Sequence, residues 1–205
     1  MLSSEVPLSA QDPTCYLASD GIIDWRSDRI ARLSETIVPR DDSLRFAVAA
    51  FEYVRDTVRH SVDTSDKRVT LTASEVAREK TGLCFSKTHL LAALLRSRGI
   101  PSGFCYQRLV DGKGGHVVHG LLAVYIEGDW HRQDPRGNKP GVNAQFSIGE
   151  EQLAWAVDPD LGEVDYPTIL ASPHPMVIKA LQSSTDMLDI AQNKLPSDIE
   201  IDNAS

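Results

Sequence analysis

The stretch that most constrains the fold of this chain is the apolar run that follows Cys84. Its large apolar residues recur at helical spacing: Leu90, Leu91, Leu94 and Leu95. The Gly-Ile-Pro sequence at residues 99–101 is typical of the end of a helix. Just before the cysteine, Thr81 and Gly82 predict a turn and a cap. The sequence therefore predicts a buried helix with a cysteine in its first turn.

This position makes Cys84 a candidate nucleophile. A thiol in the first turn of a helix lies near the positive end of the helix dipole and near free backbone N–H groups, and both favour the thiolate. A thiolate that a histidine can reach is a nucleophile for covalent catalysis. The candidate histidine is His119, and Asp134 is the candidate residue that orients its ring. The backbone N–H of Cys84 can donate to an oxyanion.

Length and composition indicate one domain, or one domain with an appendage, in 205 residues. A hydrophobic content of 41% is enough for an ordinary core. The formal net charge of -8 argues against nucleic acid or an anionic membrane as the main partner. Three cysteines, Cys15, Cys84 and Cys105, do not make a disulfide framework. We expect a cytoplasmic protein, because no apolar run spans a bilayer and no basic region precedes an apolar stretch at the start.

The chain before Cys84 is predicted to be helical. Asp41 and Asp42 offer a cap, and the segment Thr72 to Glu75 resembles a capping box. The predicted segments, in order, are an arm at residues 1–20, helices at 24–38 and 42–59, a loop at 60–69 and a short helix at 72–80.

The chain after Pro101 is predicted to form a sheet. Strands are expected at residues 103–110, 116–126 and 130–133, and the two turns between them imply antiparallel pairing. Helices followed by such strands predict an α+β fold. The remaining predicted segments are a loop at 134–149, a proline-rich surface segment at 159–175, a helix at 176–194 and an acidic, frayed tail from 196.

In this arrangement His119 lies on the middle strand and Asp134 at the end of the next one. Side chains directly opposite each other on antiparallel strands lie roughly 5 Å apart. Counted from Gly128, the two residues are offset, so we expect a bulge or a turn longer than two residues. His116 is the rival histidine. Since strand residues three apart face opposite sides, only one of them can point at Cys84. We favour His119 because its register to Tyr125 and Trp130 fits the family resemblance described next.

Several motifs resemble the transglutaminase-like superfamily, in particular its bacterial, cysteine-peptidase type. They are Gly82-Leu83-Cys84, the run at residues 90–101, His119 with Val124-Tyr125, and Gly128-Asp129-Trp130 before Asp134-Pro135. The resemblance covers roughly residues 45–137. It implies a papain-like core in which helices pack on an antiparallel sheet and a catalytic cysteine lies at a helix N-terminus. It also implies one domain (1–205), with a core at about 42–137, an N-terminal arm at 1–23 and a C-terminal extension at 138–205.

The resemblance further implies acyl transfer from amides through a thioester. Cys84 would be the nucleophile, His119 the acid and base, and Asp134 the residue that orients the ring. We expect a peptide or protein amide as substrate, hydrolysis rather than transfer to a small amine, and no cofactor or metal. Two alternatives stay open: a non-catalytic binding module that keeps the fold, and acetyl transfer to an arylamine. The chain departs from the family pattern after the histidine, at residues 120–123, and at Arg136.

Other residues are weaker candidates. Tyr106, Gln107 and Trp130 are predicted to line the substrate cleft or stabilise an oxyanion, and Gln133 is considered for the same role. A zinc site is a minor alternative, because the spacings of Cys84, His89, His116 and His119 match no common zinc motif. We interpret Cys105 as buried filler and Cys15 as incidental, and His60 and His174 carry little signal.

Overall fold

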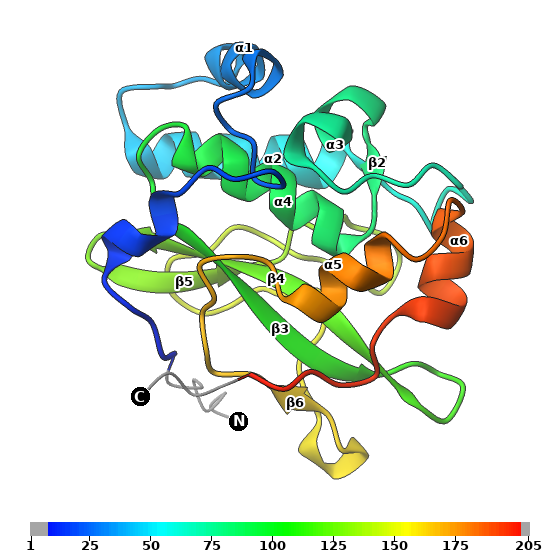
Figure 1. The fold of residues 1–205 in the computed structure, drawn as a ribbon. Helices are drawn as coiled ribbons and strands as arrows, with labels where there is room; N and C mark the ends of the chain where they lie inside the picture. The colour runs from blue at the N-terminus through cyan, green and yellow to red at the C-terminus, as the bar shows by residue number, and fades with distance from the viewer. Residues whose placement is uncertain (1–7, 202–205) are drawn as a thin grey trace.

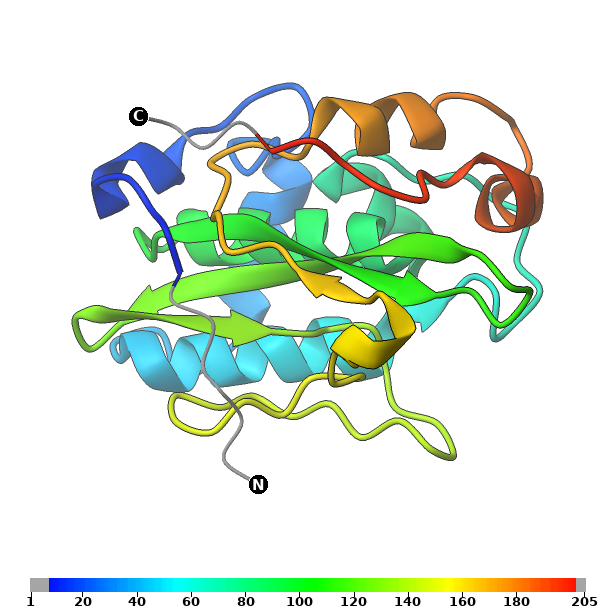
Figure 2. The same ribbon diagram turned by 90° about the horizontal axis from the view of Figure 1, so that it is seen from below.

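A computed structural model describes residues 8–201. Its centre is a four-stranded antiparallel sheet, in the order β5-β4-β3-β6. Helices cover one face of this sheet (Figure 1). Seen face-on, the sheet has α4 directly behind it, with α2 along the β5 side and α5 along the β3 side (Figure 2). The fold is therefore α+β, as predicted, and its core lies between the sheet and α4.

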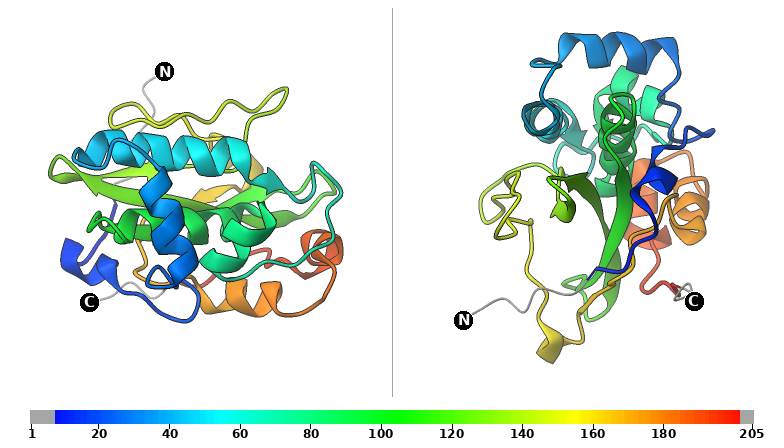
Figure 3. Two further views of the ribbon diagram at one scale, coloured as in Figure 1. Left: turned by 90° about the horizontal axis from the view of Figure 1, so that it is seen from above. Right: turned by 90° about the vertical axis from the view of Figure 1, so that its left-hand side faces the viewer.

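The second and third helices before Cys84 begin at the predicted caps, whereas the first begins at Asp28, after Ser27, rather than at the predicted residue 24. α1 spans Asp28–Thr36, and α2 spans Ser43–Thr57, where the Asp42 side chain accepts from Arg45 N. α3 spans Ala73–Glu79 and has the predicted capping box between Thr72 and Glu75. These helices form the layer above the sheet (Figure 3). Within residues 8–201, no helix is long and apolar enough to cross a membrane.

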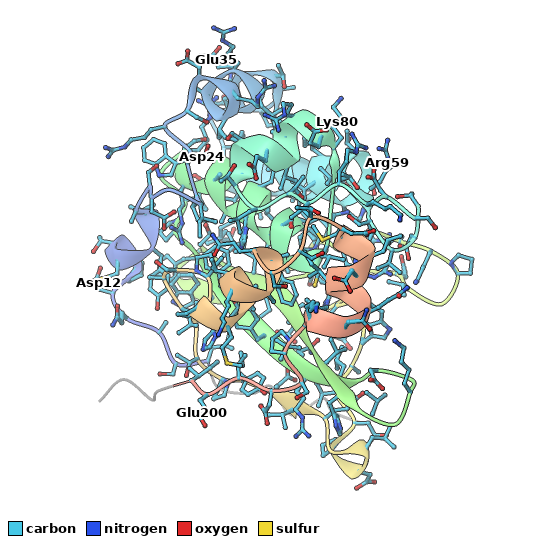
Figure 4. All side chains as sticks on the ribbon, turned by 45° about the vertical axis from the view of Figure 1, so that its right-hand side comes forward. Asp12, Asp24, Glu35, Arg59, Lys80 and Glu200 are labelled. Atoms are coloured by element: carbon cyan, nitrogen blue, oxygen red, sulfur yellow. The ribbon has the colours of Figure 1, made fainter. Side chains whose placement is uncertain are left out.

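The segment that leads into α4 differs from the prediction. Thr81–Gly82 forms strand β2, which pairs in parallel with β1, Arg59–His60, instead of forming a turn. Arg59 and Lys80, whose backbones are joined by a hydrogen bond, lie at the outer surface of this pair (Figure 4). The predicted loop at 60–69 therefore starts one residue too early. The N-cap of α4 is Leu83, which makes no side-chain cap, so the predicted cap before Cys84 is wrong.

Helix α4 spans Cys84–Arg96, and every one of its residues is buried. The helix ends at Arg96, just before the predicted stop at residues 99–101, where Gly99 has a φ of +72° that suits glycine and Ile100 N bonds back to Leu95 O. The predicted leucines pack in the main core.

The sheet follows the predicted strands closely. β3 spans Ser102–Val110, β4 spans His116–Ile126 and β5 spans Asp129–Gln133. The turn between β4 and β5 has two residues, Glu127 and Gly128, both with positive φ. The pairing is regular from Ile126↔Asp129 to Leu122↔Gln133, so the expected bulge or longer turn is wrong.

The chain after β5 runs along one side of the sheet and then along the other (Figure 3). No helix or named strand occurs between β5 and the 3₁₀ turn Pro159–Leu161, as the predicted loop requires. Within the predicted surface segment, β6 (Val164–Asp165) pairs with β3, which the sequence did not predict. The N-terminal segment also reaches this edge: Tyr16, in the turn Pro13–Leu17, donates to Ile169 O (2.9 Å). Residues 1–7 of the predicted arm lie outside the described residues.

The predicted last helix is divided. α5 spans Pro175–Leu181, α6 spans Met187–Asp189, and a π-helical turn covers Ile190–Lys194. The break occurs before Asp186, which caps the new helix by accepting from Leu188 N. The tail is packed rather than frayed up to residue 201, since Ile199 is buried; residues 202–205 lie outside the described residues.

Candidate active site

The first turn of α4 presents Cys84 at the floor of a cleft. The cysteine is 7% exposed and is the first residue of the helix. The first helical backbone bond of this turn runs from Lys87 N to Leu83 O, so the N–H groups of Cys84 and its two successors lie ahead of the helical ladder. Without a capping side chain, this helix start is suited to receive negative charge.

His119 and Asp134 form a buried pair. His119 Nε2 donates to Asp134 Oδ2 at 2.8 Å. Asp134 is fully buried and also accepts from the backbone N–H groups of Arg136 (3.0 Å) and Ala154 (3.2 Å). Burial raises the pKa of Asp134, but the charge of His119 and these hydrogen bonds lower it below its usual range. The carboxylate is therefore held ionised beside the ring.

His119 also interacts with Cys84. Burial lowers the pKa of His119, but the negative charges of Asp134 and of the Cys84 thiolate, and hydrogen bonds to both, raise it well above the usual value. Because Nε2 faces Asp134, Nδ1 is the nitrogen left for the sulfur. Trp155 packs edge-on against the ring, with centroids 5.0 Å apart. The side chains of Cys84, His119 and Asp134 therefore lie in series, with the imidazole ring between the sulfur and the carboxylate.

A cleft of about 660 Å³ opens over these side chains. Cys84 and His119 both line it, together with Leu83 from the helix start. The walls come from four other places: the β1 segment, the β3–β4 hairpin, the loop after β5 and the C-terminal segment. The arrangement can bring a carbonyl carbon to the thiolate while the imidazolium lies within reach of the leaving group.

The sequence matches the family model of the transglutaminase-like superfamily over residues 31–135, slightly more than half of the chain. The chain belongs to this superfamily. Among curated proteins no match is found.

Two solved structures are similar to this chain at 18% identity. One is the "Putative Cysteine Protease from Cytophaga hutchinsonii", with a TM-score of 0.47, covering 59% of this chain and 40% of that chain. The other is a "TGase", with a TM-score of 0.40, covering 59% of this chain and 33% of that chain. This chain thus spans well under half the length of either.

The departure from the transglutaminase-like pattern after His119 has a packing cause. A Cβ built on Gly120 would lie 2.6 Å from Cδ1 of Phe85, the residue that follows Cys84. Real Cβ atoms do not approach that closely. Glycine therefore lets the first turn of α4 lie directly on β4, one residue away from both Cys84 and His119.

The departure at Arg136 has a structural partner too. Its guanidinium makes two hydrogen bonds to Asp63, at 2.7 and 2.9 Å, and stacks on Trp155. Trp155 in turn contacts His119. Arg136 is 4% exposed and lines the cleft. It thus fixes the wall against which the histidine ring rests.

His60 is a cleft residue that the sequence did not reveal. It lies on β1, paired with Gly82 two residues before Cys84, and its ring lines the cleft. Its Nδ1 is buried without a hydrogen-bond partner, 3.9 Å from Asp63 Oδ2. Burial and then the charge of Arg136 lower the pKa of His60 to about 3, so the ring is neutral. A two-residue parallel strand leaves no periodic signal by which the sequence could have revealed this position.

The C-terminal wall was also missed. Ala191, Gln192, Asn193 and Leu195 line the cleft. Pro196 O accepts from Val118 N (2.9 Å), next to His119. The cleft residues of the C-terminal segment lie outside the region matched by the superfamily model. The composition of the segment did not predict that it lines the cleft.

None of the weaker sequence candidates lines the cleft. Tyr106 is buried, and its hydroxyl accepts from His174 N. Gln107 lies opposite His119, but its amide donates to Asp165 (2.9 Å). Trp130 packs between Tyr16 and Tyr125, and Gln133 bonds to the backbone of Ser147.

The rival histidine and the other cysteines have separate surroundings. His116 bonds through one nitrogen to Arg108 and through the other to Leu161 O, on a different part of the cleft. His89 donates to Leu71 O inside the core. Burial raises the pKa of Cys105 to about 12, and Cys15 is exposed. Within residues 8–201, no three His, Cys, Asp or Glu side chains are grouped to hold a metal.

Proposed function

We propose that this chain is a cysteine-dependent acyl-transfer enzyme that acts on amide or peptide bonds. Cys84 is the nucleophile, His119 the acid and base, and Asp134 the residue that orients the ring. One observation carries the proposal. His119 bonds to Asp134 at 2.8 Å and interacts with Cys84, with which it lines one cleft, and this connection supports a triad of the three side chains.

The first half of the proposed reaction forms a thioester. The thiolate of Cys84 attacks the carbonyl carbon, and a C–S bond forms as the carbonyl oxygen takes the negative charge. When the tetrahedral intermediate collapses, the C–N bond breaks and the imidazolium of His119 gives its proton to the leaving amine. Asp134 holds the ring in the orientation that both transfers need.

The oxyanion needs donors that face it. The backbone N–H of Cys84 lies at the uncapped helix start, and the neutral ring of His60 lines the cleft nearby. We propose that these two groups stabilise the charge on the carbonyl oxygen. A neutral imidazole is suited to this task, because it donates without competing with His119 for the proton.

In the second half, water attacks the thioester. His119 takes the proton from water, a C–O bond forms, the C–S bond breaks and the thiolate is restored. An amine in place of water would give transamidation. We favour hydrolysis, with a peptide or protein amide as substrate. The chemistry needs a free thiol, and all three cysteines are unpaired, so we propose a reducing compartment such as the cytoplasm.

The proposal is tested by incubating wild type and Cys84→Ala with a library of peptides and γ-glutamyl amides, with and without an added amine. Mass spectrometry detects hydrolysis and amine incorporation as separate products. We expect hydrolysis of some members by wild type and none by Cys84→Ala. If neither protein converts any member, the acyl-transfer proposal fails and a non-catalytic binding module is favoured. If amine products dominate, the preference for hydrolysis is wrong.

A further inference from the structure

Lys87, three residues after Cys84 in the first turn of α4, is completely buried. Its ammonium donates to Arg55 O at 3.1 Å and to Val58 O at 2.5 Å. Lysine is almost never fully buried unless its charge has such partners. A charged group at this place, beside the proposed nucleophile, requires an explanation that packing alone does not supply.

The two acceptors identify what Lys87 binds. Arg55 lies in the last turn of α2 and Val58 is its C-cap, so both carbonyls belong to the negative end of that helix. The chain continues from Val58 directly into β1, which carries His60 into the cleft. Lys87 therefore joins the turn of Cys84 to the end of α2, from which the chain leads into the strand of His60.

A third segment closes around the same ammonium. Gly137 follows Asp134 by three residues and has a φ of +108°. A Cβ built on it would lie 3.3 Å from Lys87 Nζ and 3.3 Å from Arg55 O. The ammonium thus lies where three segments meet, and each segment carries one group of the proposed site: Cys84, His60 or Asp134.

The surrounding charges are mixed. Burial and then the positive charge of Arg136 lower the pKa of Lys87 to about 7, against the opposing charges of Asp134, Asp56 and Asp63. Below neutral pH the ammonium is therefore charged, and its field acts on the anions of the site with little screening by water.

We propose that Lys87 is a positioning residue for the Cys84 nucleophile. It fixes the first turn of α4 against the C-terminal end of α2 and against the turn after Asp134, and its positive charge favours the ionised thiolate. This inference rests on the proposed function, but its test needs no substrate, because it measures alkylation of Cys84 by iodoacetamide as a function of pH.

The main variant is Lys87→Met, which keeps the length of the side chain and removes its charge and donors. We expect alkylation of Cys84 to slow about tenfold on the acid side of neutrality, as the midpoint of its acid limb rises by about one pH unit. Leu95→Ala is the structural control, because it removes a fully buried side chain from the far end of the same helix. It should lower thermal stability and leave that midpoint unchanged.

A second pair of variants acts without removing the lysine. Gly137→Ala places a methyl group against the ammonium, whereas Gly141→Ala imposes a similar φ strain (+83°) with no atom within 4 Å. We expect the midpoint to rise in Gly137→Ala and to stay at the wild-type value in Gly141→Ala. This pair keeps the inference testable if Lys87→Met does not fold.

The outcomes separate the two proposals. If wild-type Cys84 reacts no faster than Cys105, the proposed function fails. If wild-type Cys84 is reactive but the midpoint is the same in Lys87→Met and Gly137→Ala as in wild type, Lys87 has only a structural role and this inference is overturned. A midpoint that rises equally in Leu95→Ala would overturn it as well.

Discussion

His119 donates to Asp134 at 2.8 Å although the two residues are not directly opposite each other in the sheet. β5 ends at Gln133, which pairs with Leu122, so Asp134 follows at the level of Leu121. His119 is the diagonal neighbour of that position on the same face, a separation that long side chains can bridge. The pair therefore depends on the register that the two-residue turn at Glu127 and Gly128 sets.

Asp134→Asn should reduce the alkylation rate of Cys84 and any turnover by at least about a hundredfold. The amide removes the negative charge that holds His119 as imidazolium, and it can present an N–H to the ring where an acceptor is needed. Thermal melting serves as the control for folding. A rate within about twofold of wild type in a folded variant would show that the hydrogen bond does not serve the nucleophile.

Gly120→Ala should lower the free energy of unfolding by about 1–3 kcal/mol and slow alkylation of Cys84. The added methyl group meets the ring of Phe85 and must displace the turn that carries the cysteine. Gly21→Ala is the matched control, since a Cβ there meets nothing within 4 Å. Urea unfolding measures the free energy of unfolding of both variants. Equal stability of the two variants would mean that Phe85 moves aside freely.

Arg136→Lys should lower the free energy of unfolding by about 1–2 kcal/mol. Lysine keeps the charge but loses the two-point bond to Asp63 and the stacking on Trp155. Lys139 binds the same carboxylate at 3.1 Å but is largely exposed. Lys139→Gln should therefore lower the free energy by less than about 0.5 kcal/mol. A larger loss in Lys139→Gln than in Arg136→Lys would contradict this account of the wall.

His60→Gln should change how stability depends on pH. The pKa of His60 is about 3 in the folded protein, against about 6.5 when unfolded, so between these values only the unfolded chain binds a proton. The contribution of His60 to stability is present above about pH 6.5 and is lost as the pH falls toward 3, by about 1.4 kcal/mol per pH unit. Urea unfolding in this window should show a slope smaller by that amount in the variant; an unchanged slope would mean that the ring is protonated in the folded state.

The sequence contained enough information to predict the helices before the sheet, the three main strands and the placement of Cys84 and His119 in one cleft. Three local signals agree with the fold: the helical spacing of Leu90 to Leu95, the capping box at Thr72 and the β-forming residues after Pro101. The position of the turn at Gly128 also predicted that His119 and Asp134 are offset along their strands. The way the structure bridges this offset was not predicted, because His119 and Asp134 meet as diagonal rather than directly opposite neighbours.

Other parts of the site depend on contacts between distant segments. His60 and Lys87 acquire their surroundings when β1 pairs with β2 and α2 ends against α4, and a two-residue strand has no periodicity. The division of the last helix follows from the cap at Asp186, and its burial against the cleft depends on tertiary packing. Such features depend on packing between segments that lie far apart in the sequence, and local propensity does not encode that packing.

The most direct test of the central claim is the rate at which iodoacetamide modifies each cysteine at neutral pH, in wild type and in His119→Ala, read by peptide mass spectrometry. Cys84 is 7% exposed, whereas Cys15 is exposed and Cys105 is fully buried, so exposure alone predicts that Cys15 reacts first. The proposed triad predicts that Cys84 reacts fastest in wild type and slows markedly in His119→Ala. Labelling of Cys84 no faster than Cys105, and unaffected by His119→Ala, would contradict it.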